Sequence, residues 1–241
     1  MLITSMTAQS QRIVNNPYYD DEHYHFGFVL GLNTMQYALR MNDGFQQVSH
    51  NANEWPGETS GKLNVYNIVS ANTPGFSVGI VGNLRLSKYF DLRFVPTLSF
   101  GERKTEYTFS VGNDLHVVEK SIFSTFVELP LLLKYKSRRV GNIRGYMVVG
   151  PNYKLDLASQ KANEIETEAY GTVVNNINVK KTDLALDFGG GFDFYTAYFK
   201  FGIEIKISYG LSSILVPDEA IYTTSFDNVH NKVYMLSFTF E

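Results

Sequence analysis

The side chains best suited to acid–base or metal chemistry are five histidines, at positions 23, 25, 50, 116 and 230. His23 and His25 are two residues apart, so they would share one face of a strand and could bind a metal together. No third ligand follows at a spacing typical of a metal site. A pair beside Tyr18, Tyr19 and Tyr24 is more typical of an aromatic belt at a membrane interface. We therefore expect neither a metal nor another cofactor.

Evidence for catalysis is equally sparse. The chain has no cysteine, which excludes thiolate chemistry, and the spacing of the histidines identifies no catalytic constellation. Gly189 to Gly191 follow Phe188, but no helix or Lys-Ser/Thr pair comes next, as a phosphate-binding loop requires. Packing explains these glycines better. We expect no enzymatic activity and no small-molecule substrate.

The chain is rich in aromatic residues, although it is not hydrophobic overall. The 18 Phe and 16 Tyr residues accompany a mean hydropathy of only −0.14. No stretch of eighteen apolar residues exists, so we expect no transmembrane helix. The 21 basic and 24 acidic residues are spread evenly along the chain, which gives no reason to expect a nucleic-acid partner.

The aromatic residues belong to a period-two pattern, which predicts strands. From Tyr198 to Leu211, apolar residues alternate with Lys200, Glu204, Lys206 and glycine or serine. Similar alternation recurs along the chain. The predicted strands are 23–38, 75–88, 90–108, 117–136, 142–158, 182–195, 197–212 and 230–240.

The connections between these strands alternate in length. Tight turns are expected at 87–91, 137–141 and 195–197, and longer polar segments at 42–73, 112–116, 159–181 and 213–229. This alternation predicts an all-β fold, a transmembrane antiparallel up-and-down β-barrel of about eight strands with short periplasmic turns and long extracellular loops. The expected location is the bacterial outer membrane, crossed many times by one chain.

A soluble eight-stranded barrel with its apolar face inside is the rival prediction. The apolar faces carry on the order of forty large side chains, whereas an eight-stranded barrel has an interior only just wide enough for side chains. They must therefore face outward, into lipid.

The opposite, charged face would then line the lumen. This predicts an internal network of Arg85, Arg93, Arg103, Lys134, Arg144, Lys154, Lys200 and Lys206 with Glu128, Asp156, Asp183, Asp187, Asp193 and Glu204. Charges in a narrow lumen need partners. The network could form a conduit for ions or a peptide, but a salt-bridged plug is favoured because eight strands leave no wide channel. Glu128 is expected to pair with a basic residue of a neighbouring strand.

Prolines and the ends of the pattern complete the expectations. Pro96, Pro130 and Pro151 fall inside predicted strands, where they would remove ladder donors, so we expect β-bulges there. Residues 1–10 are expected to be the remnant of a signal peptide, residues 11–22 a periplasmic arm, and residues 23–241 the barrel. Trp55, in the longest expected loop, could contact a partner or pack that loop.

Two segments resemble a known family. Asn15-Asn16-Pro17-Tyr18-Tyr19-Asp20, followed by His23-Tyr24-His25-Phe26-Gly27-Phe28 and Leu30-Gly31-Leu32-Asn33, is similar to the start of the PorT family of Bacteroidota outer-membrane proteins. The segment from Val127 to Tyr135 is similar to a strand shared more widely among small Bacteroidota barrels.

The resemblance implies an accessory or assembly component of the type IX protein secretion system, with other secretion proteins as partners. No catalytic residue is carried over from the family. A free-standing structural or adhesive barrel is the alternative, and a barrel enzyme is a more distant one.

Overall fold

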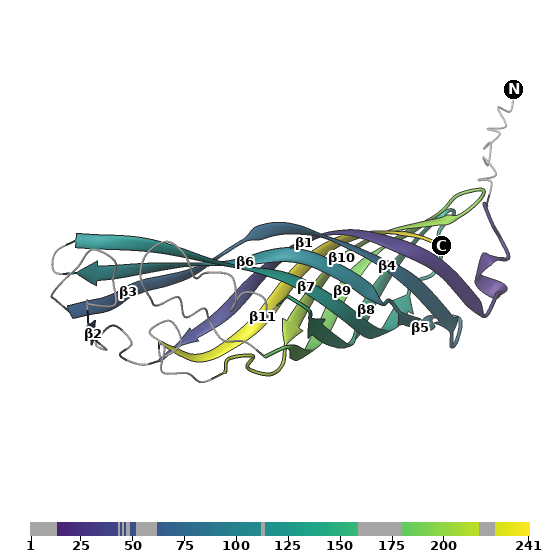
Figure 1. Cartoon of the computed structure of the whole chain (residues 1–241). Coiled ribbons are helices and arrows are strands. Elements are labelled where there is room, and N and C mark those ends of the chain that lie inside the picture. The colour runs from purple at the N-terminus through teal and green to yellow at the C-terminus, as the bar shows by residue number, and fades with distance from the viewer. Residues whose placement is uncertain are drawn as a thin grey trace, which may run out of the picture.

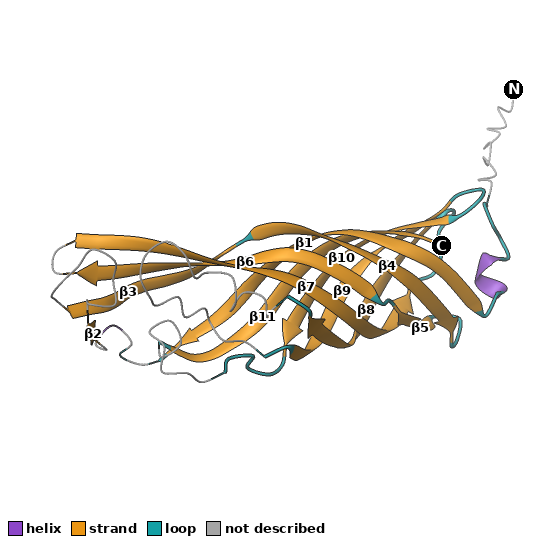
Figure 2. Cartoon of the chain, viewed as in Figure 1, coloured by secondary structure: helices purple, strands orange, loops and turns teal. Residues whose placement is uncertain are grey.

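The computed structural model describes residues 14–42, 44, 46, 49–51, 62–111, 114–158, 180–216 and 225–241. Within these ranges the chain forms one antiparallel sheet that closes on itself (Figures 1 and 2) and a short 3₁₀ helix, η1 (Tyr19–Asp21). None of the described helical residues forms a helix long and apolar enough to cross a membrane. The strands are β1 (Tyr24–Met41), β2 (Ser49–Asn51), β3 (Lys62–Ala71), β4 (Thr73–Arg85), β5 (Phe90–Phe94), β6 (Thr97–Val111), β7 (Asp114–Lys136), β8 (Ile143–Asp156), β9 (Thr182–Tyr195), β10 (Lys200–Gly210) and β11 (Phe226–Phe240).

The closed ring has eight members. β1 pairs with β11 on one side and with β4 on the other, which leaves the ring without an open edge. β5 and β6 occupy one position between β4 and β7. From β7 the ring continues through β8, β9 and β10 to β11. The predicted up-and-down barrel is therefore confirmed, and a closed ring is what a membrane requires of strands.

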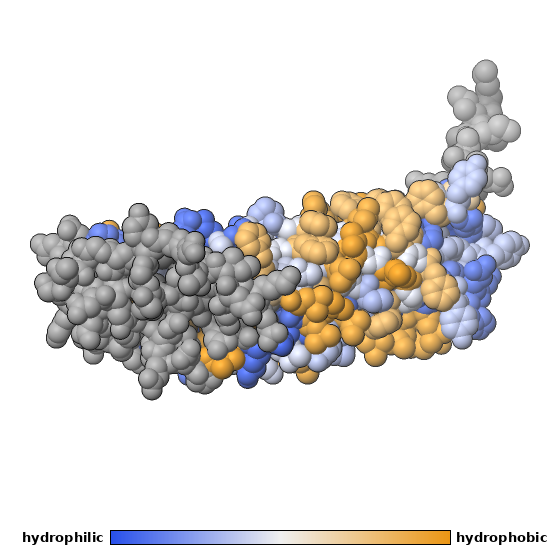
Figure 3. Space-filling model, in the orientation of Figure 1, coloured by the Kyte–Doolittle hydropathy of each residue, from blue (hydrophilic) through white to orange (hydrophobic). Residues whose placement is uncertain are grey.

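Side chains alternate strictly between the two faces of the wall. Along β1, Phe26, Phe28 and Leu30 are exposed on the outside, whereas Val29 and Asn33 are buried inside. On the side shown in Figure 3, the outer apolar residues form a broad band across the strands, with hydrophilic residues at the end near η1. The outer surface is thus suited to lipid. We call the end that carries the short turns and η1 the periplasmic end, because short turns lie on that side in such barrels.

Two connections at the opposite, extracellular end differ from those predicted. The segment 42–73 was expected to be a loop, but it contains β2 and β3. The connection after β6 was expected to be long, but only residues 112–113 separate β6 from β7. β3, β6 and β7 instead extend beyond the ends of β1 and β11 (Figure 1). These strands continue because their alternating pattern continues past the membrane.

The predicted bulges at the prolines are wrong. β5 and β6 pair with β7 in a single register, since Phe94 opposes Leu131 and Thr97 opposes Glu128. The β7–β8 register is also the same on both sides of Pro130 and Pro151. Among the described strands, register shifts occur elsewhere, at Arg40/Met41 of β1 and at Val65/Asn67 of β3.

The prolines instead interrupt single hydrogen bonds. The Val95 N–H donates to the Pro130 carbonyl (3.3 Å), but Pro130 has no N–H to return the bond. The Thr97 hydroxyl donates to the Val95 carbonyl (2.8 Å) in its place. The wall therefore tolerates a proline without a change of register because a nearby hydroxyl satisfies the orphaned carbonyl.

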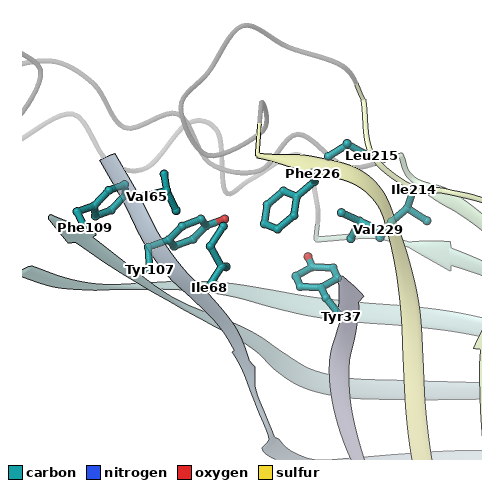
Figure 4. Packing of buried hydrophobic residues seen from close by; sticks show 9 residues of the cluster. All are labelled: Tyr37, Val65, Ile68, Tyr107, Phe109, Ile214, Leu215, Phe226 and Val229. Carbon is teal, nitrogen blue, oxygen red and sulfur yellow. The ribbon is translucent and has the colours of Figure 1, made fainter. Parts of the chain in front are cut away.

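An apolar cluster lies at the extracellular mouth of the barrel. It brings together inward-facing residues of β3 and β6 with residues of β1, of β11 and of the segment after β10 (Figure 4). Its buried members are Tyr37, Val65, Ile68, Tyr107, Phe109, Ile214, Leu215, Phe226 and Val229. The projecting sheet thus packs over the mouth.

Candidate functional site: the barrel interior

Charged side chains from all parts of the ring fill the interior. Of the network expected from the sequence, the structure buries Arg93, Arg103, Glu128, Lys134, Arg144, Lys154, Asp156, Asp183, Asp187, Asp193, Lys200, Glu204 and Lys206. They point inward because the polar residues occupy the positions between the lipid-facing ones. Most form ion pairs with strands that are distant in the sequence.

A layer towards the periplasmic end is built around Arg93 of β5. Its guanidinium donates to the Glu204 carboxylate of β10 at 2.8 Å, and its second terminal nitrogen lies 3.5 Å from the Glu241 carboxylate. Beside it, the Lys134 ammonium donates to Asp193 at 2.7 Å. The Arg93–Glu204 pair crosses the lumen between opposite strands of the ring, and the Lys134–Asp193 pair joins β7 to β9 past β8.

The next layer contains two carboxylates bridged by one amide. The Asn152 side-chain amide donates to Glu128 at 2.8 Å and to both Asp187 oxygens at 3.1 and 3.2 Å. Lys206 lies 3.0 Å from Asp187, and Lys154 lies 3.7 Å from Glu128. Glu128 and Lys154 are direct neighbours across the β7–β8 pair.

The layer nearest the extracellular end is centred on Arg103. Its guanidinium donates to Asp156 at 2.5 Å and to the Asn231 side-chain oxygen at 2.9 Å. It also lies against the rings of Tyr37 and Phe126, with centroid distances of 4.9 and 5.1 Å. Arg103 therefore marks the transition from the charged interior to the apolar cluster at the mouth.

The arm before β1 closes the periplasmic end. Arg144 of β8 forms a bidentate ion pair with Asp20, at 2.7 and 2.9 Å, and the Tyr195 hydroxyl donates to the same carboxylate at 3.1 Å. The Tyr19 ring stacks on the His25 ring at a centroid distance of 4.1 Å. The arm is thus held inside the rim by charge and by aromatic packing.

These contacts shift ionisation at the periplasmic end. Burial raises the pKa of the Asp20 carboxyl, but the charge and hydrogen bonds of Arg144 outweigh this effect and hold the pKa below its usual value. Burial raises the pKa of the Tyr19 phenol. Burial also disfavours the charged form of Glu241, but Lys200 at 2.7 Å and Arg93 more than compensate, so its pKa lies well below its usual range. Asp20 and Glu241 are therefore charged at neutral pH.

A second set of contacts ties the arm to two periplasmic turns. Arg139, in the turn between β7 and β8, donates to the backbone carbonyls of Asn15 and Asn16 and lies 3.7 Å from the centre of the Tyr195 ring. The Asn16 side chain donates to the Thr196 carbonyl at 3.0 Å, in the turn between β9 and β10. Asn16 adopts a left-handed backbone conformation (φ 43°), which asparagine tolerates better than most residues.

Several residues of this end were missed or differently placed by sequence reasoning. Arg85 lies at the rim, is partly exposed, and approaches Asp21 at 3.7 Å. Asp91 and Lys136 form a buried ion pair at 2.7 Å. Both follow the same alternation as Arg93 and Lys134 and could have been found from it. The role of Asp20 had no such signal, because the arm is not a strand.

The sequence motifs that we considered for metal binding or phosphate binding have structural roles. His23 precedes β1 and is exposed, whereas His25 points inward, so the two do not form a pair. Among the described residues, no group of three His, Asp or Glu side chains is placed to hold a metal. Gly189 and Gly191 lie against the backbone of β10, where a side chain would clash. Trp55 and residues 1–10 lie outside the described residues.

One segment matches the sequence motif of a hydrolase nucleophile, but it also has a structural role. Gly75-Phe76-Ser77-Val78-Gly79 has the Gly-x-Ser-x-Gly pattern, but it lies within β4 and not at a strand-to-helix turn. The Ser77 hydroxyl accepts from the Asn33 amide at 2.6 Å and shares a hydrogen bond with Ser99 at 2.9 Å. It is a buried link between strands.

The closed ring, the outer apolar band and the paired charges inside define a small outer-membrane β-barrel with a filled lumen. The chain belongs to the family of the outer membrane protein beta-barrel domain, whose model matches residues 7–216. The protein is therefore a bacterial outer-membrane protein that crosses the membrane many times and lies in lipid.

Similar solved structures share this class. They include OprG from Pseudomonas aeruginosa (12% identity, 90% of this chain and 95% of that chain, TM-score 0.40) and Neisserial surface protein A (10%, 91% and 99%, TM-score 0.41). A third is Ail, the attachment invasion locus protein of Yersinia pestis (11%, 91% and 98%, TM-score 0.37). No curated protein matches the sequence.

Proposed function

We propose that this barrel is a non-conducting, non-enzymatic accessory component of protein secretion across the outer membrane, of the PorT type, and that it acts by binding partners. The observation that carries this proposal is the filled interior. Nearly every buried charge has an opposite charge or an amide within hydrogen-bond distance, as in the Arg93–Glu204 and Lys206–Asp187 pairs. Ions entering the lumen would have to break these pairs.

Closure at both ends supports the same proposal. The arm occupies the periplasmic end through the Asp20–Arg144 ion pair, and the apolar cluster occupies the extracellular mouth. An eight-stranded ring has no room for a wide channel. A barrel of this kind can contribute to secretion through its rims and projections, which are where a rigid scaffold usually carries recognition residues.

The assignment to type IX secretion rests on the resemblance of the N-terminal segment to the PorT family. The Asn15–Asp20 part of that segment is also the part that pins the β7–β8 and β9–β10 turns. A structural role for the segment is compatible with the resemblance, because the side chains of Asn15, Asn16 and Asp20 make several of these contacts.

A free-standing adhesive or structural barrel is the second candidate function. The projection of β3, β6 and β7 beyond the membrane favours it, since such a sheet can present a surface to other cells or molecules (Figure 1). The two candidates differ in what a deletion should do to export.

A deletion strain and bilayer recordings test the proposal together. Removing the protein should abolish export of type IX cargo, and the purified protein should show little conductance in planar bilayers. Export should return with the wild-type gene. Normal cargo export in the deletion strain would defeat the secretion role and favour the free-standing barrel, whereas large, stable conductance would refute the filled lumen.

A further inference from the structure

The upper part of β7 projects beyond the membrane, and one of its edges has no paired strand among the described residues. β8 pairs with β7 only from Phe126 onward, and the Leu157 N–H donates to the Thr125 carbonyl at 2.8 Å just above that point. Among the residues that the structure describes, no strand pairs with this edge of β7 between Asp114 and Ser124. On its other edge the same stretch is paired with β6 throughout.

The alternation of backbone direction along β7 shows which of its N–H and C=O groups point away from β6. Thr125 directs its carbonyl towards β8, whereas Pro130 directs its carbonyl towards β5. Because alternate residues point to opposite sides in an antiparallel sheet, the odd-numbered residues from Leu115 to Phe123 direct their N–H and C=O groups away from β6. Water can hydrate such a row of alternating donors and acceptors, but an added extended polypeptide can pair with all of them along its length.

The side chains on the outer face of this edge are apolar and exposed. Leu115 is 59% exposed, Val117 63% and Phe123 73%. The barrel's lipid-facing band does not explain Leu115 and Val117, since they lie on the projecting part of β7, several residues beyond its pairing with β8. They can contact alternate side chains of an added strand.

Around Glu119, the outer face of β6 and β7 carries more acidic than basic side chains. Glu106 and Glu119 lie directly opposite each other across the β6–β7 pair, and like charges in that position are destabilising. Lys104 lies 2.5 Å from Glu119, and Glu102 adds a further carboxylate on the same face of β6. A basic residue brought next to Glu119 and Glu106 would relieve the repulsion.

We infer that this edge of β7 binds an extended segment of a partner polypeptide that carries apolar residues and a basic residue at every second position, on one face of the added strand. A second copy in the same membrane fits less well, because its β7 would run in the same direction and could not form an antiparallel pair. The inference names the surface through which the barrel would bind a partner, and it rests on the proposed function. Peptide binding tests the edge, whereas export and conductance test the role.

Fluorescence anisotropy with the full-length protein in detergent micelles tests the inference. The probe is a short labelled peptide in which valine and lysine occupy every second position, on one face of a strand, and threonine occupies the positions between them. It should bind, and the same peptide with alternate backbone nitrogens methylated should not, because methylation removes its ladder donors. Replacing lysine by glutamate should weaken binding. Equal binding of the methylated peptide would overturn the inference, as would no binding of either peptide, which would mean that another part of the chain covers the edge.

Ser121→Pro is the decisive variant. The Ser121 N–H points away from β6, so proline removes a donor from the free edge and leaves the β6–β7 ladder intact. Affinity for the valine–lysine peptide should fall at least about tenfold, while Ser121→Ala should bind as the wild type does. Both variants should still migrate faster on gels when unheated than when boiled, as expected of a closed barrel that resists detergent until it is heated. Unchanged binding by Ser121→Pro would refute edge pairing.

A cysteine variant separates the partner from a second copy. The chain has no cysteine, so Val117→Cys introduces a single thiol on the edge. In oxidised membranes it should remain monomeric on non-reducing gels. Efficient disulfide dimer formation would instead assign the edge to a second copy of the chain and overturn the inference.

Discussion

Asp187→Asn isolates the energetic role of the internal ion pairs, because it removes a charge and keeps the shape. Asp187 is fully buried and lies 3.0 Å from the Lys206 ammonium. At that distance, an effective dielectric constant of about 20 gives an attraction of about 5 kcal/mol. The asparagine can keep a hydrogen bond to Asn152, but it leaves Lys206 without its nearest counter-charge. Breaking a buried pair in this way costs about 3 to 5 kcal/mol.

Denaturant unfolding in detergent micelles, followed by the mobility of unheated samples on gels, measures the free energy of unfolding. The matched control is the exposed Arg40–Asp227 pair, whose atoms lie 3.4 Å apart and whose side chains are 77% and 47% exposed. Arg40→Met should cost less than about 1 kcal/mol. The double variant Asp187→Asn, Lys206→Met should be more stable than Asp187→Asn alone, since no unpaired charge remains. Equal losses for Asp187→Asn and Arg40→Met would refute the view that the interior is a buried, paired network.

Three further predictions follow from other parts of the molecule. The pKa of Asp20 is lower in the folded protein than its ordinary value of 3.8. The stability that Asp20 contributes is therefore present above that pH and is lost as the pH falls through the folded pKa. Protease cleavage of the arm should increase below about pH 4 in the wild type and be pH-independent in Asp20→Asn. Pro151→Ala supplies an N–H opposite the Leu131 carbonyl and should raise stability by about 1 kcal/mol in the same unfolding assay, whereas a loss would mean that the proline ring packs there. Trp55→Ala should leave stability nearly unchanged and weaken co-purification with partners, and full retention of partners would exclude Trp55 from recognition.

The candidate interior could be anticipated from the sequence as a set of residues but not as a set of pairs. Strict alternation places Arg93, Lys134, Asp187 and their neighbours on one face, because side chains of a strand point to opposite sides in turn. Which acid meets which base depends on the stagger of the closed ring. Arg93 and Glu204 are 111 residues apart, and no local spacing relates them.

The arm and the prolines show the limits of pattern reasoning in two different ways. Asp20 lies outside any periodic segment, so nothing in the sequence marked it as the partner of Arg144. At Pro130 a missing donor was expected to force a bulge, but the Thr97 hydroxyl satisfies the Val95 carbonyl and the register continues. A rule that considers the proline alone cannot predict that the side chain of another residue compensates for the missing donor.

The sequence by itself determined that the chain is a barrel with its apolar face outward, because period-two alternation with that many large apolar residues has no other volume-compatible solution. Only the tertiary structure decided how the interior is closed. Ring closure brings β1, β4 and β11 together and sets the stagger that pairs distant charges, while β6 and β7 continue past the membrane, where one edge of β7 has no paired strand among the described residues. These features depend on where strands end relative to one another, and that is fixed by contacts between strands and not by the pattern within any one of them.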